Sequence, residues 1–351
     1  MKQEPRKLLF RRMAQRHMPA RVQIETTRQC NLNCAHCMVV NSLGQAGAPG
    51  LSLERFAELL DELRRAGTFH INLTGGEPLC RPDALDMLGI ALNAGFLLTL
   101  QTNGTLLENA HVDLLCERAN RVRQVGVSLY SMDPAVHDSV TRTPGSHKRT
   151  LRAIHMLRRA GLPVVVVTAL TRLNAHSFHD VESFCTGNGL MFQYNTLITP
   201  QDDGGRSPLD LRLQERLLCR LPRPWETFMD EDRAPAPGDL GPDSPLSSWC
   251  SMGATACYIT ATGDVRPCSV VNTPAGNLLH QSFEQIWTRS ELFQKLRAYK
   301  LSDFECFQCE HFPTCHPCPG LAFLEHGEFT VPAREVCRIN SVFFKKSEVA
   351  T

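Results

Sequence analysis

The sequence has almost no net charge and no long hydrophobic run. Its 37 Lys and Arg residues against 36 Asp and Glu residues give a formal net charge of +1, so no overall electric field draws the chain to nucleic acid or to an anionic membrane. Its longest apolar stretches, such as 162–167, have the length of a strand and fall well short of a membrane span. We therefore expect a globular protein with neither nucleic acid nor a membrane as partner.

An export signal is also lacking. The segment 1–21 is rich in Lys and Arg, but its apolar stretch Leu8–Phe10 is too short for the apolar region of a signal peptide. We interpret this segment as a basic, solvent-exposed N-terminal arm and expect a cytoplasmic protein. A surface that grips an acidic peptide or partner is the alternative interpretation of the arm.

Cysteine, in contrast, is abundant, with 15 residues. The cysteines fall in short, metal-like spacings, which favour metal ligation over disulfides in a chain without an export signal. Cys30, Cys34 and Cys37 form the first group. Three thiolates spaced in this way can hold three corners of one [4Fe-4S] cluster and leave one iron open to a substrate or cosubstrate. Zinc is the alternative, although it would need a fourth ligand and His36 is badly placed inside the loop to supply one.

Strand-like and helix-like segments alternate from Val22 to Asn195. The predicted strands are 22–26, 70–74, 96–100, 124–129, 164–170 and 191–195, and the predicted helices between them are 52–66, 82–93, 109–116, 147–160 and 177–188. Ser177 and Asp180 predict a capping box at the start of the last helix. This alternation predicts right-handed βαβ units, a parallel sheet with α/β architecture, and an active site at the C-terminal ends of the strands.

Two motifs at such strand ends resemble one known family. Cys30-x3-Cys34-x2-Cys37 is similar to the cluster loop of radical S-adenosylmethionine (SAM) enzymes, and Gly75-Gly76-Glu77-Pro78 is similar to their second signature. The resemblance implies a partial (β/α)6 TIM-like barrel. It also implies that SAM chelates the open iron of the [4Fe-4S] cluster, and that an electron from the cluster cleaves its sulfonium to release a 5′-deoxyadenosyl radical that abstracts hydrogen from a substrate.

The resemblance further implies SAM-contacting residues. Those expected to bind the cosubstrate are Gly75, Gly76, Glu77 and Pro78 at the methionine amino group, Asn103, Ser128 and Arg142 at the ribose or carboxylate, and His36 at the adenine edge. Arg142 suits a carboxylate because its guanidinium can donate two hydrogen bonds at once. The alternatives are that Asn103 merely belongs to a turn, that Arg142 is a solvated surface charge, and that His36 is an incidental loop residue.

A second group of cysteines occupies the C-terminal part of the chain. Cys250, Cys257 and Cys268 flank a predicted hairpin over 258–267, a capping box at Ser282 predicts a helix running to Tyr299, and the spacing Cys306-x2-Cys309-x5-Cys315-x2-Cys318 precedes Cys337. Zinc knuckles that brace a small domain would account for these cysteines. The pattern also resembles the SPASM extension of radical SAM enzymes, which holds two auxiliary [4Fe-4S] clusters.

The SPASM resemblance assigns ligands to each auxiliary cluster. It implies Cys250, Cys257, Cys268 and Cys318 for the nearer cluster and Cys306, Cys309, Cys315 and Cys337 for the outer one. The gap before Cys318 is x2, where many members have x3. We expect most of the four remaining cysteines, Cys80, Cys116, Cys185 and Cys219, to be buried small hydrophobic residues.

The stretch 200–248 changes character and marks a predicted domain boundary. Proline and glycine are dense in 234–245, and only a modest helix over 209–221 is expected, so the stretch indicates a linker without a packed core. The predicted organisation is a basic arm (1–21), a radical SAM partial barrel (22–199), the barrel end and linker (200–248), and a SPASM-type iron-sulfur domain (249–351).

These features predict an enzyme, a radical SAM oxidoreductase or maturase that abstracts hydrogen from a peptide or protein to form a crosslink or oxidise a side chain. A flavodoxin or ferredoxin would reduce the first cluster. The alternatives are a dehydrogenase or decarboxylase of a small metabolite or tetrapyrrole, and a non-catalytic metal-binding scaffold. The 21 residues before the first strand are too few for a winged-helix peptide-binding domain, so peptide recognition would need a separate protein or a short substrate. No general base can be identified, although Gln193, Tyr194 and Asp202 fall at the expected end of the barrel.

Overall fold

A computed structural model describes residues 12–39, 50–222, 241–312, 315 and 317–349. Most of the basic arm (1–11), the central part of the predicted linker (223–240) and His316 lie outside the described residues. Among the helices that are described, none combines the length and apolar character needed to cross a membrane.

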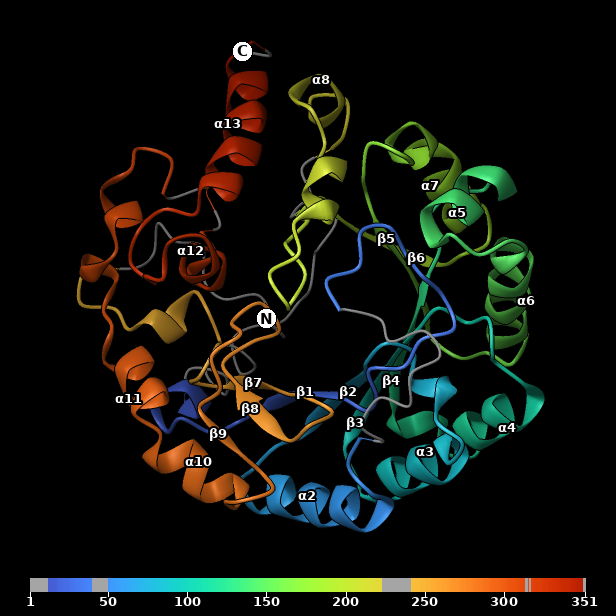
Figure 1. Ribbon diagram of the computed structural model, residues 1–351, viewed down its shortest axis with the longest axis horizontal. Coiled ribbons are helices and arrows are strands. Elements are labelled where there is room, and N and C mark those ends of the chain that lie inside the picture. Colours follow the sequence, from blue (N-terminus) through green and yellow to red (C-terminus); the bar gives the residue numbers. More distant parts are fainter. Residues whose placement is uncertain (1–11, 40–49, 223–240, 313–314, 316, 350–351) are drawn as a thin grey trace, which may run out of the picture.

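A single curved sheet with helices on its outer side confirms the partial barrel (Figure 1). Six parallel strands follow one another in chain order: β1 (Arg21–Glu25), β2 (His70–Thr74), β3 (Leu97–Thr102), β4 (Val122–Ser128), β5 (Val164–Ala169) and β6 (Met191–Asn195). The helices between them are α2 (Leu53–Arg65), α3 (Ala84–Asn93), α4 (Asn109–Glu117), α5 (Pro134–Thr141), α6 (Ser146–Arg159) and α7 (Phe178–Gly187). All six strands were predicted from the sequence, whereas α5 was not.

The two faces of each strand have different chemistry. The outward face is apolar: Val22, Ile24, Ile71 and Leu73 belong to the main core, which they share with Leu63 of α2 and with the other helices. The inward face of the first four strands is polar. Across β1 to β4, four polar residues stand in register on this face: Gln23, Asn72, Thr99 and Gln124. This alternation follows from the two-residue period of a strand, and it lines the β1–β4 side of the lumen with amides and hydroxyls.

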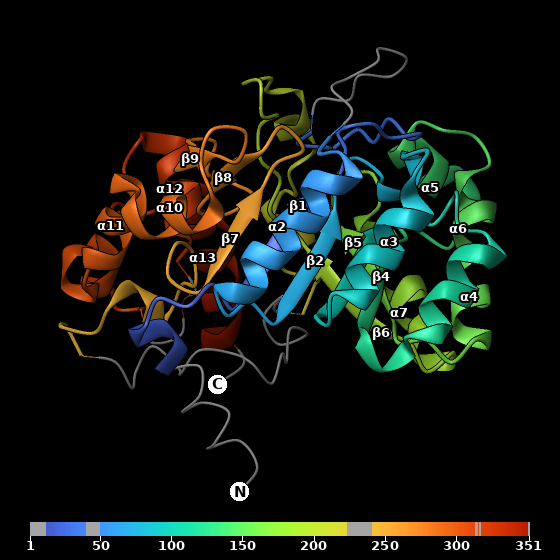
Figure 2. The same ribbon diagram turned by 90° about the horizontal axis from the view of Figure 1, so that it is seen from below.

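The predicted C-terminal hairpin joins the barrel sheet. β7 (Ala256–Ile259) pairs in parallel with β1, followed by β8 (Asp264–Arg266) and β9 (Gly276–Asn277), so that the sheet has nine strands in the order β6-β5-β4-β3-β2-β1-β7-β8-β9. Figure 2 shows β7 alongside β1, between the barrel and the C-terminal helices. The hairpin was predicted, but its continuity with the barrel was not.

The C-terminal helices differ from the prediction in one respect. The Ser282 capping box is confirmed, with its hydroxyl accepting from Gln285 N, but the predicted long helix is broken at Ser290 into α10 (Phe283–Arg289) and α11 (Glu291–Ala298). Two more helices follow, α12 (Pro319–His326) and α13 (Arg334–Val349).

The described part of the predicted linker packs into a core, and this prediction was wrong. The expected helix over 209–221 is instead a short 3-10 turn, Ser207–Leu211, followed by α8 (Glu215–Leu218). Leu213 and Leu218 are buried against Phe178 of α7 and Phe343 of α13. Apolar side chains spaced irregularly along a turn-rich stretch still bury themselves when α13 supplies the opposite face. The predicted capping box at Ser177 is also wrong, because its hydroxyl makes no cap hydrogen bond.

Removing a side chain from the contact between α2 and the sheet should weaken the fold. Leu63 is fully buried, so Leu63→Ala should lower the free energy of unfolding by about 2 to 5 kcal/mol. Leu85→Ala in α3 is the control, since Leu85 is 40% exposed and its loss should cost about 0.5 kcal/mol or less. Urea denaturation followed by circular dichroism measures both, and equal midpoints would contradict the placement of Leu63.

Candidate active site: the cluster loop and the C-terminal cysteines

The loop that follows β1 carries Cys30, Cys34 and Cys37 and is held on one side by the turn after β2. Gly76 N donates to Thr27 O at 2.7 Å and Glu77 N donates to Gln29 O at 2.7 Å. A Cβ atom on Gly75 would lie 2.4 Å from Thr27 O, and one on Gly76 would lie 2.3 Å from Gln29 O. The two glycines are therefore needed because the cluster loop itself passes this close, whereas the sequence indicated close approach to a ligand.

Glu77 is buried and its carboxylate is occupied within the protein. It accepts hydrogen bonds from Leu79 N at 3.1 Å, Thr102 Oγ1 at 2.7 Å and Asn103 N at 2.6 Å. Burial raises the pKa of this carboxyl, while the three donors act in the opposite direction. Glu77 thus ties the turn after β2 to the end of β3, and Pro78 begins the 3-10 turn that follows.

The helix α5 holds the cluster loop on its other side. Asn33 N donates to Thr141 O at 3.1 Å and Ala35 N donates to Val140 O at 2.8 Å, so the last carbonyls of α5 accept from the loop backbone. Sequence reasoning missed this helix. Its signal was present, because Asp133 caps the helix through Ala135 N and Pro134 occupies the first helical position.

The three thiols of the loop lie close enough to repel one another as thiolates. Burial raises the pKa of the Cys30 thiol to about 12, with a smaller contribution from Cys37. Burial and the charges of Cys37 and Cys30 likewise raise the pKa of Cys34. Three partly buried thiols this close together are unfavourable as free anions and favourable as ligands of a cationic iron centre, so the donor set fits a [4Fe-4S] cluster.

Hydrogen bonds also reach the cysteine sulfur atoms. Leu32 N donates to Cys30 Sγ at 3.4 Å, and Asn103 Nδ2 lies 3.8 Å from the same sulfur. Asn103 also donates to Asn31 Oδ1 at 3.0 Å and accepts from Thr105 N at 2.8 Å. The turn residue Asn103 therefore supports the cluster loop directly.

The other predicted SAM contacts are distributed around Tyr130. The Tyr130 hydroxyl hydrogen-bonds with Cys34 and with Ser128, and its ring meets that of His36 edge-on at 5.0 Å between centroids. Burial lowers the pKa of His36 to about 4, so its imidazole is neutral at physiological pH. Arg142 lies at the C-terminal end of α5 with a left-handed φ of 51° and an exposed side chain. The structure thus brings His36 and Ser128 together and leaves Arg142 at the rim.

A charged network links the cluster loop to the loop after β6 and to β7. Arg28 forms an ion pair with Asp202 and lies 3.9 Å from Glu25 at the end of β1. Glu25, only 3% exposed, accepts from Tyr258 Oη at 2.7 Å and from Ala261 N at 3.2 Å. Of the residues suggested at this end of the barrel, Asp202 therefore reaches the cluster loop.

Tyr194 lies on the other side of its strand. Its side chain is fully buried in the cluster formed with Phe178 and Phe343, and its hydroxyl donates to Pro222 O. It therefore faces away from the barrel lumen. Gln193 precedes it on β6, and the strand alternation places it on the inward side.

The C-terminal cysteines form two groups. Burial, and to a smaller extent the charges of Cys318 and Cys268, raise the pKa of Cys250 to about 12, and Cys268 Sγ lies 3.1 Å from the position of a Cβ on Gly320. Burial, and to a smaller extent the charges of Cys337, Cys315 and Cys309, raise the pKa of Cys306 to about 12. Asn340 Nδ2 of α13 donates to Cys315 Sγ at 2.9 Å.

Cys257 is not brought to either group. It is 3% exposed in the middle of β7, between Ala256 and Tyr258, and it belongs to the apolar core on the outer face of the sheet. The charged group that acts on its pKa is the Arg297 guanidinium, which opposes the rise caused by burial. The cysteine charges that act on Cys250 are thus those of Cys268 and Cys318, and the ligand set of the nearer cluster stays a prediction.

The four remaining cysteines do not follow the prediction that most are buried. Cys185 is buried, Cys80 is partly exposed, and Cys116 and Cys219 are exposed. Among the described residues, no three His, Cys, Asp or Glu side chains are grouped closely enough to hold one single metal ion.

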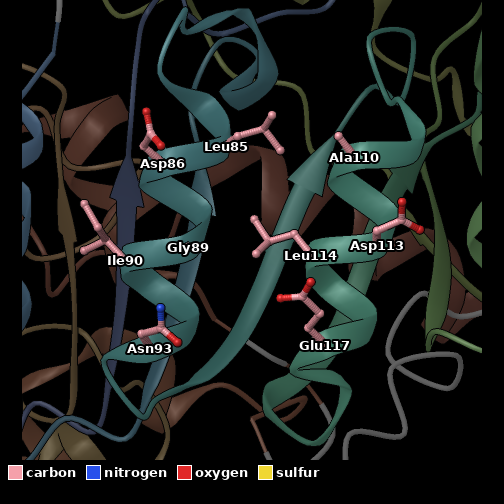
Figure 3. A pocket seen from close by; sticks show the side chains of 9 residues that line it. All are labelled: Leu85, Asp86, Gly89, Ile90, Asn93, Ala110, Asp113, Leu114 and Glu117. Carbon is pink, nitrogen blue, oxygen red and sulfur yellow. The ribbon is translucent and has the colours of Figure 1, made fainter.

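A shallow groove on the outer face of the barrel has no link to these groups. It lies between α3 and α4, with Leu85, Ile90 and Leu114 in its walls and Asp86, Asp113 and Glu117 beside them (Figure 3). It contains no cysteine and lies on the helical side of the sheet, so we assign it no chemistry.

The position of Cys257 generates a prediction about iron content. Cys257→Ala should keep the iron and sulfide content of the reconstituted protein, because its thiol lies in the apolar core, whereas Cys250→Ala should lose the iron of one cluster. Metal analysis together with electron paramagnetic resonance of the reduced proteins measures this difference. Equal iron loss in the two variants would show that Cys257 is a ligand.

Comparison with known proteins agrees with both halves of the site. The radical SAM superfamily model matches residues 24–185, and the SPASM iron-sulfur cluster-binding domain model matches residues 250–319. The AdoMet-dependent heme synthase of Nitratidesulfovibrio vulgaris is 27% identical over 87% of this chain and 88% of its own length. The antilisterial bacteriocin subtilosin biosynthesis protein AlbA of Bacillus subtilis is 30% identical over 80% of this chain and 61% of its own length.

The fold has solved counterparts. The crystal structure of Streptococcus suis SuiB bound to the precursor peptide SuiA superposes with a TM-score of 0.70 at 16% identity, covering 93% of this chain and 79% of that one. The matched domains imply a [4Fe-4S] cluster, SAM and auxiliary iron-sulfur clusters as cofactors. The chain is a radical SAM enzyme with a SPASM iron-sulfur domain.

Proposed function

We propose that this radical SAM enzyme modifies a peptide, forming a crosslink or oxidising a side chain. The observation that carries the proposal is the polar lumen of the barrel, where Gln23, Asn72, Thr99 and Gln124 stand in register across four strands. Amides and hydroxyls match the N–H and C=O groups of a peptide, whereas a flat aromatic macrocycle is better bound by apolar walls.

Asn72 makes this argument specific. Its Oδ1 is buried and has no hydrogen-bond partner within the described protein. A buried acceptor without a donor costs about 1 to 3 kcal/mol, which a substrate N–H would recover. The proposal is further supported by the name of AlbA, a bacteriocin biosynthesis protein that is 30% identical to this chain.

We assign Cys30, Cys34 and Cys37 to the [4Fe-4S] cluster that binds SAM. That cluster, once reduced, supplies the electron that splits SAM into methionine and a 5′-deoxyadenosyl radical. The chain positions the loop through Glu77 and α5. Tyr130 lies beside the thiol of Cys34, and Ser128 and His36 lie next to Tyr130. A flavodoxin or ferredoxin is the proposed electron donor, and Arg142 at the rim is the proposed carboxylate contact.

A tetrapyrrole is the second candidate substrate. It is favoured by the heme synthase of N. vulgaris, which this chain matches over 88% of that protein's length, compared with 61% for AlbA. The two candidates are separated by incubating the reduced enzyme with synthetic peptides encoded by small neighbouring reading frames, or with an iron tetrapyrrole. The peptide proposal requires that a peptide increases 5′-deoxyadenosine formation and that mass spectrometry shows a loss of hydrogen from that peptide. It is rejected if only the tetrapyrrole increases 5′-deoxyadenosine formation and is modified.

Loss of one cluster-loop cysteine should abolish SAM cleavage. In Cys34→Ala the first cluster loses a ligand, so 5′-deoxyadenosine formation after dithionite reduction should fall to background, at least a hundredfold below wild type, an effect worth about 2.7 kcal/mol or more. Cys116→Ala, at an exposed cysteine of α4, is the control and should retain full cleavage. Liquid chromatography of the quenched reaction measures the product.

Two other outcomes are informative. A wild-type protein that leaves SAM intact after anaerobic reconstitution and reduction would contradict the assigned cluster loop. Cleavage that persists in Cys34→Ala would show that this thiol is not a ligand.

A further inference from the structure

Arg266 of β8 carries a guanidinium with few partners beside the proposed active site. Its Nε is buried and has no hydrogen-bond partner within the described protein. Its ion-pair partner is Asp264, whose Oδ2 lies 3.7 Å from Nη2, a distance too long for a hydrogen bond. Asp264 is engaged elsewhere, because its Oδ1 accepts from Asn277 Nδ2 at 2.8 Å.

The sheet register places this guanidinium on the inner face. Arg266 is the cross-strand partner of Tyr258, and Tyr258 in turn is the partner of Gln23 on β1. Cross-strand partners project from the same face of a sheet. Tyr258 reaches Glu25 at the end of β1 from that face, whereas the alternate residues Cys257 and Val265 lie in the outer core.

Contacts and sequence connect Arg266 to both groups of cysteines. Cys268 of the nearer C-terminal group follows it by two residues, and the chain Tyr258, Glu25 and Arg28 leads from it to the cluster loop. Its side chain is 15% exposed, so it is largely desolvated but not sealed off from solvent. An arginine held in this way is poised to accept an anionic group from a molecule inside the barrel.

We propose that Arg266 binds a carboxylate of the substrate. The inference rests on the proposed function, because it assigns the recognition of the same substrate. A guanidinium offers two parallel donors that match the two oxygens of a carboxylate.

The local charge balance favours a carboxylate over a phosphate. Arg28, the other guanidinium of the network, is already paired with Asp202 and lies near Glu25, and Asp264 lies beside Arg266 itself. The three carboxylates would repel a doubly charged phosphate more strongly than a carboxylate, so the incompletely paired Arg266 suits a ligand with a single negative charge. The peptide source is a C-terminal carboxylate, and the tetrapyrrole source is a propionate.

The test compares acids with their neutral derivatives on the reconstituted full-length enzyme in the presence of SAM. The peptide probe is a pool of N-acetylated tetrapeptides that contain no Asp or Glu, used as free acids and as C-terminal amides. The tetrapyrrole probe is hemin, used as the free acid and as its dimethyl ester. Equilibrium dialysis read by mass spectrometry or absorbance measures the bound fraction.

Wild-type enzyme should retain the acid at least tenfold more tightly than the neutral form of the matching probe, and Arg266→Gln should abolish that preference. Arg266→Lys keeps the positive charge but not the two parallel donors, so it should keep only part of the preference for the acid. This variant replaces Arg266→Gln in the test if Arg266→Gln fails to fold. Arg289→Gln, at an exposed arginine of α10, should behave like wild type. Iron content and melting temperature identify any variant that has lost its fold.

The outcomes separate the two proposals. A preference for peptide acids that depends on Arg266 supports both. A preference seen with hemin alone, and lost in Arg266→Gln, supports the carboxylate site and overturns the peptide substrate. An acid preference that survives in Arg266→Gln, or the absence of any acid preference in the wild type, overturns the role of Arg266.

Discussion

The structure depends on three partly buried thiols being held together in the loop after β1. As thiolates they repel one another, and burial alone already disfavours their charged form. The thiols are held together nevertheless, because hydrogen bonds fix the loop backbone from two sides. The turn after β2 binds Thr27 and Gln29, and α5 binds Asn33 and Ala35. Most of the unusual features nearby serve this arrangement, including the paired glycines and the buried Glu77.

The strand β1 connects the two iron-binding parts of the molecule. It pairs with β2 on one side and with β7 on the other, so it belongs equally to the barrel and to the C-terminal hairpin. The charged network follows the same seam. Glu25 at the end of β1 receives Tyr258 from β7, and Arg28 just beyond it pairs with Asp202 from the loop after β6.

Local patterns made much of this predictable. The strands, the cysteine spacings and the Gly-Gly-Glu-Pro turn are each encoded within a few residues, and the six parallel strands followed from them. The hydrogen bond between Tyr258 and Glu25 joins residues 233 positions apart, and the ion pair between Arg28 and Asp202 joins residues 174 positions apart. No local sequence pattern predicts either contact. The helix α5 was missed because it is short and only its cap residues mark it. The stretch 200–222 was misjudged because its few apolar side chains become a core only when α13 covers them.

The pairing of β7 with β1 has a consequence for how the protein can be divided. A barrel cut off before the SPASM domain would leave β1 as an edge strand, with its backbone N–H and C=O groups on that side unpaired. Such an edge offers a template to strands of other molecules, and the apolar faces of Val22 and Ile24 lie along it. The C-terminal region therefore covers this edge of the barrel in addition to being its iron-sulfur domain.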